Sequence, residues 1–552
     1  MKKLMKNLLA CVVLSATALS AFGCKAVGGK SDKATLYVYS FTSGFGSEWL
    51  TSLISDYEEK MKDVEIDGKK GINIEPTAEK SDVAGSQMSS RQEVLYFLEQ
   101  QDYYELLGGN YIADITDAIT STNPYDGKTL ESKMFDDQKS YFGREVNGET
   151  RYYAYPHYFT SFGIVYDVDQ FDKLGCYFAD GYDSTAALDY MFVGDSGDKK
   201  TVGPDGEENT SDDGLPTTYE EFYLLCDYIA QNSGTPLTWA GQYRDSYLTH
   251  FINALATDYE GYEQMRLNYT FDGKATNLGK AENGKFVKDS TATPIDGSNG
   301  AELARQAGKY YGMEFYNTLY NKSYIKSQAS TLYSSTYTHL KAQEDFLKNA
   351  SNAMLLDGSW WQMEATSVFN AMAMGNESYS KQNRKLGWMP LPQHADKADQ
   401  KSTMFDIMYP LLVMKNGLST DSWQYKYALD FIQFANSDEQ LAKFTQITGC
   451  TKALNYSLDQ AQYDSLSYFG QSFYDAYKSS DIVFPYDNNL LFANNQKVFQ
   501  EIDFGTGSPL YKSTAYKDSC FVRAVEKGVT LENYFNGMYS YFSEQSIWKK
   551  AK

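Results

Sequence analysis

The chain has 552 residues, of which 50 are Lys or Arg and 72 are Asp or Glu, and its formal net charge is −22. This length is enough for two or more domains. The acidic balance argues against a nucleic-acid partner, because neutralising phosphates requires a basic surface. The chain also has 47 Tyr against 4 His. Such a composition is a poor basis for metal or acid–base catalysis and favours the presentation of flat amphipathic rings.

The amino terminus has the pattern of an export signal. Three lysines within the first six residues precede an apolar stretch, Leu8–Leu19, that is too short to span a bilayer. The sequence Ala-Phe-Gly-Cys at 21–24 resembles a bacterial lipobox, in which the cysteine is lipidated and becomes the new amino terminus. We therefore predict a lipoprotein signal peptide at 1–23, a flexible tether at 24–33 and a membrane anchor through Cys24. The protein would then lie on the extracellular or periplasmic face of the membrane. The alternative is an ordinary secretory signal that leaves Cys24 as a free thiol.

The first part of the mature chain has the pattern of a βαβ unit. Ala34–Ser40 is rich in β-branched and aromatic residues, which predicts a strand. Ser47 is a candidate N-cap, and the apolar residues Leu50–Tyr57 recur at helical spacing after it. A second extended segment follows at 71–75. Strand, helix and strand in this order are typical of an α/β fold.

Further elements alternate along the rest of the chain. We predict a strand at Phe162–Val168 and a helix that begins at a capping box, Thr218–Glu221. Residues 271–300 have the composition of a loop or hairpin. Other strands are predicted at Ala353–Leu356, Leu386–Pro392 and Met404–Lys415, and a helix at Thr420–Ala435. Four cysteines of the mature chain are far apart and are expected to be buried free thiols, Cys176, Cys226, Cys450 and Cys520.

An acidic, glycine-rich loop occupies residues 193–216. It carries five aspartates, Asp195, Asp198, Asp205, Asp212 and Asp213. Carboxylate oxygens suit Ca²⁺, but the spacing does not match the twelve-residue EF-hand loop. A solvated insertion is the favoured interpretation and structural Ca²⁺ the alternative. No cofactor is expected otherwise.

Five blocks in order along the chain resemble the solute-binding proteins of ABC importers of the maltose-binding type. They are the strand and helix after the leader, Tyr155–Gly175, Leu215–Phe222, Ala353–Trp360 and Asn416–Thr451. The second is similar to the family's glycine–aliphatic–Tyr–Asn signature, with Asp167 in place of Asn. The fourth is close to its Ala-Met…Gly-x-Trp pattern. The chain departs from the family in two long loops, 193–216 and 271–300, and in Phe405–Asp406, where glycines are common.

The resemblance implies a fold and a division of the chain. The fold would be α/β, periplasmic-binding-protein-like of type II, with two lobes and a hinged cleft between them. The first lobe would comprise 34–157 and 404–450, and the second 158–403 and 451–552. We expect the chain to cross between lobes near Tyr155–Thr160, Ser402–Asp406 and Gly449–Lys452, where closure would be a hinge motion.

The resemblance also implies a ligand, a neutral oligosaccharide. Its rings would stack on aromatic side chains and its hydroxyls would bond fixed polar groups. Trp360 matches the family's stacking tryptophan, whereas its neighbour Trp361 faces another way and is the better core residue. The candidate ligand-binding residues are Trp360, Tyr155, His157, Tyr158, Tyr243, Trp239, Phe41, Phe45 and Asp406. Scarce arginine near them favours a neutral solute over an anion.

The implied role is capture and delivery rather than catalysis. The partners would be the permease subunits of an ABC importer, and the chain would act as a monomer. Two alternatives remain open at this point. One is a binding lipoprotein for uronic-acid sugars or peptides. The other is an exported glycoside hydrolase, which would need a facing pair of carboxylates. No serine-hydrolase, zinc-protease or phosphate-loop motif is present in the sequence.

Overall fold

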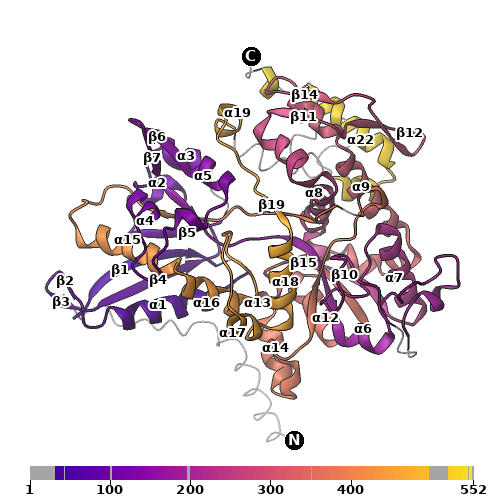
Figure 1. Ribbon diagram of the computed structural model, residues 1–552, viewed down its shortest axis with the longest axis horizontal. Helices are drawn as coiled ribbons and strands as arrows, with labels where there is room; N and C mark the ends of the chain where they lie inside the picture. Colours follow the sequence, from indigo (N-terminus) through magenta and orange to yellow (C-terminus); the bar gives the residue numbers. More distant parts are fainter. Residues whose placement is uncertain are drawn as a thin grey trace, which may run out of the picture.

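The computed structural model describes residues 32–42, 44–99, 102–194, 199–349, 351–398, 400–495, 520–544 and 546–549. The predicted leader, Cys24 and nearly all of the tether lie outside the described residues, as do Asp195 and Asp198. The chain forms two bodies that lie side by side (Figure 1). We call the body built around the amino-terminal strands the first lobe and the other the second lobe.

The first lobe is built on a five-stranded sheet. Its order is β4 (Ile72–Glu79), β1 (Ala34–Phe41), β5 (Leu95–Leu98), β18 (Leu411–Met414) and β8 (Ala154–Pro156). β1 pairs in parallel with β4 and β5, as the βαβ pattern predicted, whereas β18 runs antiparallel to both of its neighbours. A segment from late in the chain therefore lies inside the sheet of the first lobe, and its helices appear in orange among indigo strands in Figure 1.

Three helices of the first lobe join early and late parts of the chain. They are α1 (Glu48–Lys60), α15 (Trp423–Ala435) and α16 (Asp438–Thr448). The predicted apolar face of α1 is buried, including Leu50, Leu53 and Tyr57. The Tyr57 hydroxyl donates to the Asp430 carboxylate of α15 at 2.6 Å. The first lobe is therefore discontinuous in sequence, because nearly half of the chain, residues 157–410, lies between β8 and β18.

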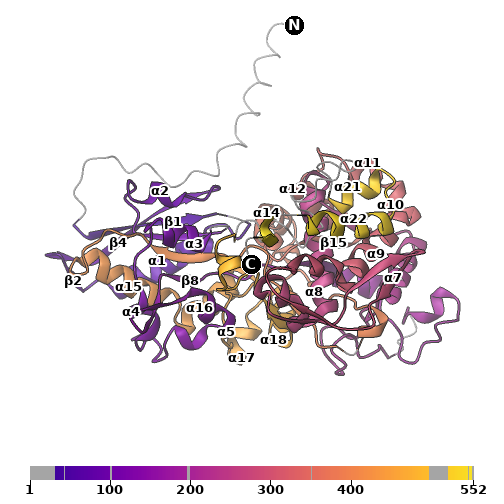
Figure 2. The ribbon, with the colours of Figure 1, turned by 90° about the horizontal axis from the view of Figure 1, so that it is seen from above.

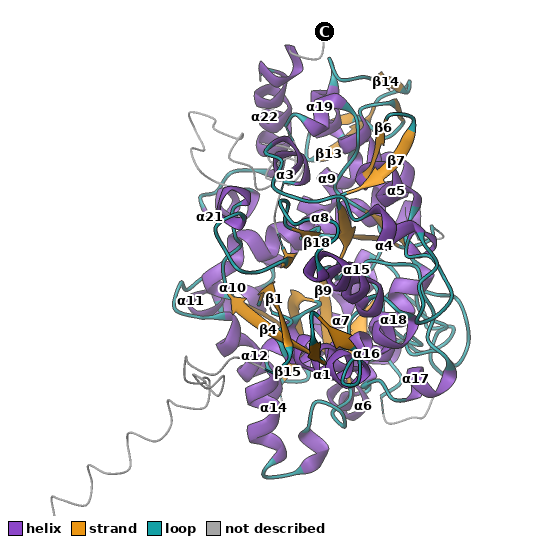
Figure 3. Ribbon diagram, turned by 90° about the vertical axis from the view of Figure 1, so that its left-hand side faces the viewer, coloured by secondary structure: helices purple, strands orange, loops and turns teal. Residues whose placement is uncertain are grey.

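The second lobe is built on a four-stranded sheet. Its order is β10 (Thr235–Trp239), β15 (Asn352–Gly358), β9 (Phe162–Asp167) and β16 (Leu386–Met389). β9 runs antiparallel to β15 and β16, and β10 is parallel to β15. Helices surround the strands in both lobes (Figure 3). The main helices of the second lobe are α6 (Val168–Leu174), α7 (Tyr219–Gln231), α8 (Arg244–Thr270), α9 (Ala307–Asn321), α12 (His339–Lys348), α18 (Tyr468–Ser479), α21 (Phe521–Glu526) and α22 (Leu531–Ser543).

Local sequence signals account for several of these elements. The predicted capping box is present at α7: the Thr218 hydroxyl accepts from the Glu221 N–H and the Glu221 carboxylate accepts from the Thr218 N–H. Asp167, which replaces the family's Asn, caps α6 and pairs with Arg384 at 2.6 Å. Residues 271–300 form two short ladders, β11 (Gly273–Ala275) with β14 (Thr293–Ile295) and β12 (Gly279–Glu282) with β13 (Lys285–Lys288).

The predicted single strand at 404–415 is wrong. The structure divides it into β17 (Thr403–Phe405), which pairs with β19 (Asp481–Val483), and β18. Between them the Asp406 carboxylate accepts from the Thr160 N–H at 3.1 Å and its hydroxyl at 2.8 Å, and Tyr409 has φ 40°. This turn breaks the strand because the chain passes from one lobe to the other there.

Three crossing segments connect the lobes within the described part of the chain, 157–161, 406–410 and 449–453. They lie side by side and are hydrogen-bonded to one another. The His157 N–H donates to the Pro410 carbonyl at 3.0 Å, and the Phe159 N–H to the Thr451 carbonyl at 3.0 Å. The Ala453 N–H donates back to the His157 carbonyl at 3.0 Å. The bundled crossings form one axis about which the lobes can rotate.

Two further features of the described residues concern the cysteines and the helices. Cys176, Cys226 and Cys450 are buried and Cys520 is half-buried, and all four are free thiols, as predicted. Among the helices that the structure describes, none has both the length and the apolar character needed to cross a membrane.

Candidate ligand site between the two lobes

Trp360 lies where the second lobe meets the first. It follows the end of β15, and its indole ring folds back over Gly358, where an added Cβ would lie 2.4 Å from the ring. The other side of the side chain contacts Gly44, in the loop between β1 and α1 of the first lobe. A Cβ on Gly44 would lie 2.1 Å from Trp360 Cδ1. The two lobes are therefore in direct contact through this ring, which is 7 % exposed.

Two tyrosines at the start of α8, Tyr243 directly before its first residue and Tyr247 in its first turn, continue the aromatic surface of the second lobe. Burial raises the pKa of the Tyr247 hydroxyl, and the Trp360 side chain lies close enough to it to lower that pKa in part. The rings of Tyr243 and Tyr247, one helical turn apart, have centroids 5.8 Å apart at an interplanar angle of 31°. Tyr243 is 41 % exposed and also lies 5.6 Å from the ring of His339. The three aromatic rings thus run from the lobe contact towards solvent.

Two carboxyl groups lie behind these rings. The side-chain amide of Gln343, on α12, donates to Asp357 Oδ2 at 3.0 Å and to Glu364 Oε2 at 2.9 Å. Burial raises the pKa of Asp357 well above its ordinary value, and the Glu364 charge raises it further. Burial also raises the pKa of Glu364. The pair therefore retains a proton at a pH where exposed carboxyls have lost it, and it offers both a donor and acceptors to a ligand.

Two basic side chains, one from each lobe, approach Glu364. His339 Nε2 lies 4.0 Å from Glu364 Oε1. The Lys80 ammonium, from the end of β4 in the first lobe, is close enough to lower the pKa of Glu364. Rings, carboxyls and an ammonium from opposite lobes therefore face one another here. Figure 2 shows the two bodies from above, with β1 and α2 (Gly85–Met88) on one side and α12 and α14 (Thr366–Ala373) on the other.

The structure brings together only part of the predicted residue set. Trp360 and Tyr243 belong to the group just described, and Phe41, half-buried at the end of β1, leads into the Gly44 loop. Trp361 is fully buried among Phe346, Phe369 and Phe469, in agreement with the expectation that it is a core residue.

Three predicted residues lie inside the first lobe instead. Tyr155 is buried, and its hydroxyl donates to the Leu130 carbonyl at 2.9 Å. Phe45 and Tyr158 are buried against each other with ring centroids 4.5 Å apart. The Tyr158 hydroxyl donates to Glu99 Oε1 at 2.8 Å. In this conformation their rings are covered by protein and offer no face to a ligand.

The remaining predicted residues are also enclosed. His157 is buried at the first crossing, with Nδ1 2.7 Å from Lys452 Nζ. Trp239 is buried, and its indole N–H donates to the Leu332 carbonyl at 3.0 Å. Asp406 is buried and holds the crossing through Thr160, and burial raises its pKa to about 7. Each of these polar atoms serves the protein's own backbone or hinge.

Sequence reasoning missed most of the polar half of this group. Tyr247, Gln343, Asp357, Glu364 and Lys80 were not predicted. Asp357 and Glu364 flank the Gly-Ser-Trp segment and Tyr247 follows Tyr243 by four residues, so local spacing could have indicated these three. Gln343 and Lys80 come from distant elements, and no local signal marks them.

The acidic loop is described in part. The Asp205 N–H donates to Asp212 Oδ2 at 3.0 Å, and the Asn209 N–H to Asp213 Oδ2 at 2.9 Å. Burial raises the pKa of Asp212 to about 6, and the Asp205 charge adds to this effect. Among the described residues, no group of three His, Cys, Asp or Glu is arranged to hold a metal ion.

Comparison with known proteins places the fold. No protein-family model matches the sequence, and no curated protein matches it. Among solved structures, a chitin oligosaccharide binding protein matches with a TM-score of 0.54 and 15 % identity, covering 93 % of this chain and 99 % of its own. Maltose-bound MalE3 of T. maritima gives a TM-score of 0.51 at 13 % identity, covering 92 % and 99 %. The chain has the fold of these binding proteins. Apo RafE from Streptococcus pneumoniae gives 0.50 at 13 %, covering 94 % and 99 %.

These matches confirm the fold class expected from the sequence, a two-lobed α/β fold of the periplasmic-binding-protein type. They cover 92–94 % of this chain. At 13–15 % identity they establish the architecture and carry over no ligand and no residue role. The choice of ligand depends on this chain's own side chains.

Proposed function

We propose that the chain is the substrate-binding lipoprotein of an ABC carbohydrate importer. It captures a neutral oligosaccharide between its lobes and delivers it to the permease subunits. Cys24 carries the lipid that anchors it to the outer face of the cell membrane, and it acts as a monomer. One observation carries the proposal: Trp360, flanked by Tyr247 and Tyr243, lies on the second lobe directly opposite the Gly44 loop of the first lobe.

The chemistry of this group suits a sugar. A pyranose has C–H faces, which pack on aromatic rings, and a rim of hydroxyls, each of which both donates and accepts hydrogen bonds. Trp360, Tyr247 and Tyr243 supply rings at successive positions. The Asp357 and Glu364 carboxyls and the Gln343 amide supply donors and acceptors beside them.

The charges favour a neutral sugar over a uronic acid. Asp357 and Glu364 lie behind the rings, and a ligand carboxylate beside them would be repelled and would have to give up its hydration. Lys80, at the edge of the first lobe, is exposed, and an exposed ammonium repays little of that cost. A peptide would need partners for its backbone amides, which the three rings do not provide.

The ring of Trp360 is covered in the described conformation. A ligand reaches it only when the lobes separate at Gly44, and closure then encloses the ligand. The hydrogen-bonded crossings supply the axis for this motion. Capture by closure also explains why so little of Trp360 is exposed when the lobes are together.

The binding experiment uses the mature protein from residue 24 onwards. Isothermal titration calorimetry with a panel of neutral oligosaccharides should detect binding. The same ligands should quench the tryptophan fluorescence of the protein. Trp360→Ala should weaken binding by more than about 1 kcal/mol, roughly five-fold or more. Trp423→Ala is the matched control, because Trp423 is half-buried on α15 in the first lobe, outside this group.

Two results would contradict the proposal. Binding of peptides or uronic acids, without binding of neutral glycans, would show that the ligand is not a neutral oligosaccharide. Release of reducing sugar by the protein alone would support the glycoside hydrolase instead. The anchor is tested separately: Cys24→Ser should move the protein from the membrane fraction to the soluble fraction without changing its affinity for the glycan.

A further inference from the structure

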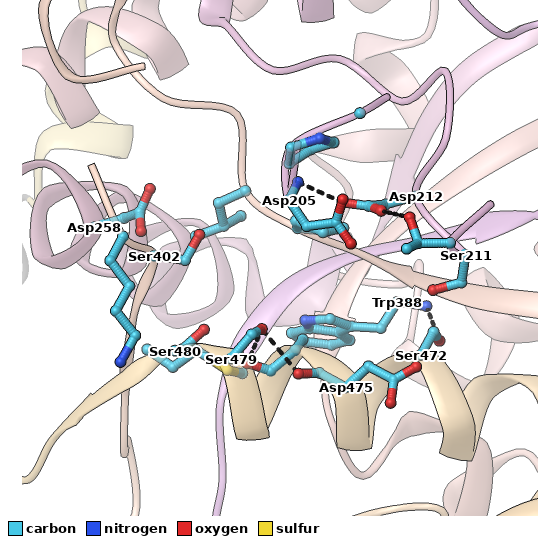
Figure 4. Close-up of a pocket in the computed structure, with 18 of the residues that line it drawn as sticks. Asp205, Ser211, Asp212, Asp258, Trp388, Ser402, Ser472, Asp475, Ser479 and Ser480 are labelled. Atoms are coloured by element: carbon cyan, nitrogen blue, oxygen red, sulfur yellow. Dashed lines mark hydrogen bonds between the residues drawn. The ribbon is translucent and has the colours of Figure 1, made fainter. Parts of the chain in front are cut away.

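A large cavity lies in the second lobe, apart from the Trp360 group. Its volume is about 1040 Å³. Its walls are α8, α18, β16 and the part of the acidic insertion from Val202 to Asp212, and the first two crossings enter the lobe beside it at Ser161 and Ser402. Figure 4 shows Trp388 at its centre, with Asp205 and Asp212 on one side and Asp475 on another.

The cavity is separate from the inter-lobe site. All of its lining residues belong to the second lobe or to the points where the crossings enter it, and it includes none of Trp360, Tyr243 and Glu364. Rotation of the first lobe therefore does not open or close it. One wall is Val202–Asp212, part of the insertion by which this chain is longer than typical members of the family it resembles.

The lining carries an excess of negative charge. Four aspartates line it: Asp205 and Asp212 from the acidic insertion, Asp258 from α8 and Asp475 from α18. Lys401 is the lining cation, and its ammonium is paired with Asp481 at 2.5 Å, outside the lining. Serine hydroxyls add hydrogen-bond acceptors between the carboxylates, at Ser402, Ser472, Ser479 and Ser480. The cavity is thus equipped to accept hydrogen bonds from positively charged donors.

Asp258 is the most deeply placed of these carboxylates. It is 2 % exposed and lies on α8. Its Oδ1 accepts from the Thr403 N–H at 2.8 Å. Its Oδ2 has no hydrogen-bond partner among the described residues within normal distance, and the amide of Gln393 is the neighbouring donor. A buried carboxylate oxygen in this state is costly unless something in the cavity satisfies it.

The arrangement of the aspartates excludes a single metal ion and favours a longer ligand. In the part of the chain that the structure describes, no three acidic groups converge on one point. The carboxylates are instead distributed around a space large enough for an extended molecule. Several separated positive charges on one flexible chain match several separated carboxylates.

We propose that this cavity binds a linear polyamine in its protonated form, independently of the saccharide bound between the lobes. Its ammonium groups would donate to Asp475, Asp258 and the insertion's Asp205 and Asp212, and its methylene segments would pack on Trp388 and Phe162. The exposed Asp205 lies at the outer end of this path and Asp258 at the inner end.

The ionisation of the aspartates supports the same ligand. Burial raises the pKa of Asp258 to about 7 and that of Asp212 to about 6, and it also raises the pKa of Asp475. A bound cation would favour the charged forms and lower these pKa values. Binding should therefore release protons near pH 6 and become tighter as the pH rises from 5 to 8.

The test titrates the mature protein with spermidine by calorimetry at pH 5, 6.5 and 8 and at two salt concentrations. We expect saturable binding that tightens at least ten-fold from pH 5 to 8 and weakens with salt. Asp475→Asn and Asp205→Asn should each weaken it at least five-fold, and Asp258→Asn more. Because Asp258 is buried, circular dichroism checks that variant, and the two exposed or half-buried aspartates carry the test if it does not fold.

Matched controls separate this site from the inter-lobe site and from general charge. Asp272→Asn removes one exposed carboxylate outside the cavity and should leave spermidine binding unchanged. Trp360→Ala should also leave it unchanged. Equal losses in Asp272→Asn and Asp475→Asn, saturable binding of a neutral saccharide abolished by Asp475→Asn, or no spermidine binding at pH 8 would each overturn the proposal. None of these outcomes depends on whether a glycan binds between the lobes.

Discussion

Gly44 of the first lobe lies against the indole ring of Trp360 of the second, with room for a hydrogen atom and not for a methyl group between them. A Cβ on Gly44 would stand 2.1 Å from Cδ1 and 2.5 Å from Cγ of the tryptophan. The absence of a side chain at Gly44 therefore allows the two lobes to approach this closely. A side chain at this position would limit closure without altering the hinge or the core of either lobe.

Gly44→Ala should hold the lobes apart. The substitution is tolerated by the backbone, because Gly44 does not adopt the left-handed conformation, but its methyl group would overlap the indole. We expect a larger radius of gyration by small-angle X-ray scattering in the presence of a bound glycan, and an affinity loss of about 1–3 kcal/mol. Gly108→Ala is the control, since its Cβ would meet nothing within 4 Å. Equal closure in both variants would contradict this role of Gly44.

Asp137 forms a second contact between the lobes. It lies on α5 (Asp136–Phe142) of the first lobe and accepts from the Tyr262 hydroxyl of α8 at 2.8 Å. Arg266, also on α8, lies 2.9 Å from it. Asp137→Ala should weaken closure and reduce glycan affinity by about 1–2 kcal/mol, because a charged hydrogen bond is lost. Asp136→Ala is the adjacent control, with an almost fully exposed carboxylate. If titration calorimetry finds the same glycan affinity in both variants, the Asp137 contact does not contribute to closure.

Lys452 is a buried cation at the third crossing. Its ammonium lies 2.7 Å from His157 Nδ1 and 4.8 Å from the centre of the Phe444 ring. Burial lowers the pKa of Lys452 to about 7. Lys452→Met should raise the free energy of unfolding at pH 7 by about 1–4 kcal/mol, because the cost of burying an ammonium that has no acidic partner among the described residues outweighs its hydrogen bond to His157. Lys426→Met, at an exposed lysine of α15, should change it little.

The advantage of Lys452→Met should depend on pH. Between about pH 7 and the pKa near 10.4 of an unfolded-state lysine, the unfolded wild-type chain binds more protons than the folded one. Wild-type stability therefore rises with pH over this range, and the difference between the two proteins should shrink from pH 7 to pH 10. Urea unfolding at several pH values measures it. A difference that grows with pH would show that Lys452 is not neutralised by burial.

The acidic insertion should be indifferent to calcium. Among the residues that the structure describes, Asp205, Asp212 and Asp213 belong to no group of three ligands arranged to hold a metal ion, so they offer Ca²⁺ no coordination shell. We expect the same melting temperature in excess EDTA and in millimolar Ca²⁺. A rise of several degrees with Ca²⁺, and not with Mg²⁺ at the same concentration, would show that the loop holds the ion.

The fold could be predicted further than the site, for physical reasons. Periodicity and turn residues identify strands such as β1 and helices such as α1, because their burial pattern follows from local geometry. The aromatic residues of β8 and β10 are different. Both sheets are covered on both faces, so Tyr155 and Trp239 are buried whichever way they point, and alternation gives no sign of which ring faces a ligand.

Local sequence patterns could not identify Gln343 and Lys80 as polar residues near Trp360. Gln343 reaches Glu364 through the packing of α12 within the second lobe, and Lys80, after β4, reaches it only where the first lobe meets the second. The tyrosine excess also has a clearer meaning now. Many tyrosines use their hydroxyls to bind buried backbone or carboxylates, as Tyr57 and Tyr155 do, so most of them stabilise a large core rather than a ligand surface.

The position of β18 in the first sheet has a consequence for biosynthesis. β18 separates β5 from β8, so the sheet cannot be completed until residues 411–414 have left the ribosome. Until then β5 and β8 present unpaired edges and an open apolar interior. More than two hundred residues of the second lobe are synthesised in the meantime, which makes the contacts of the first lobe long-range and its folding slow. A chain truncated before residue 411 should therefore aggregate or be degraded rather than yield a folded first lobe.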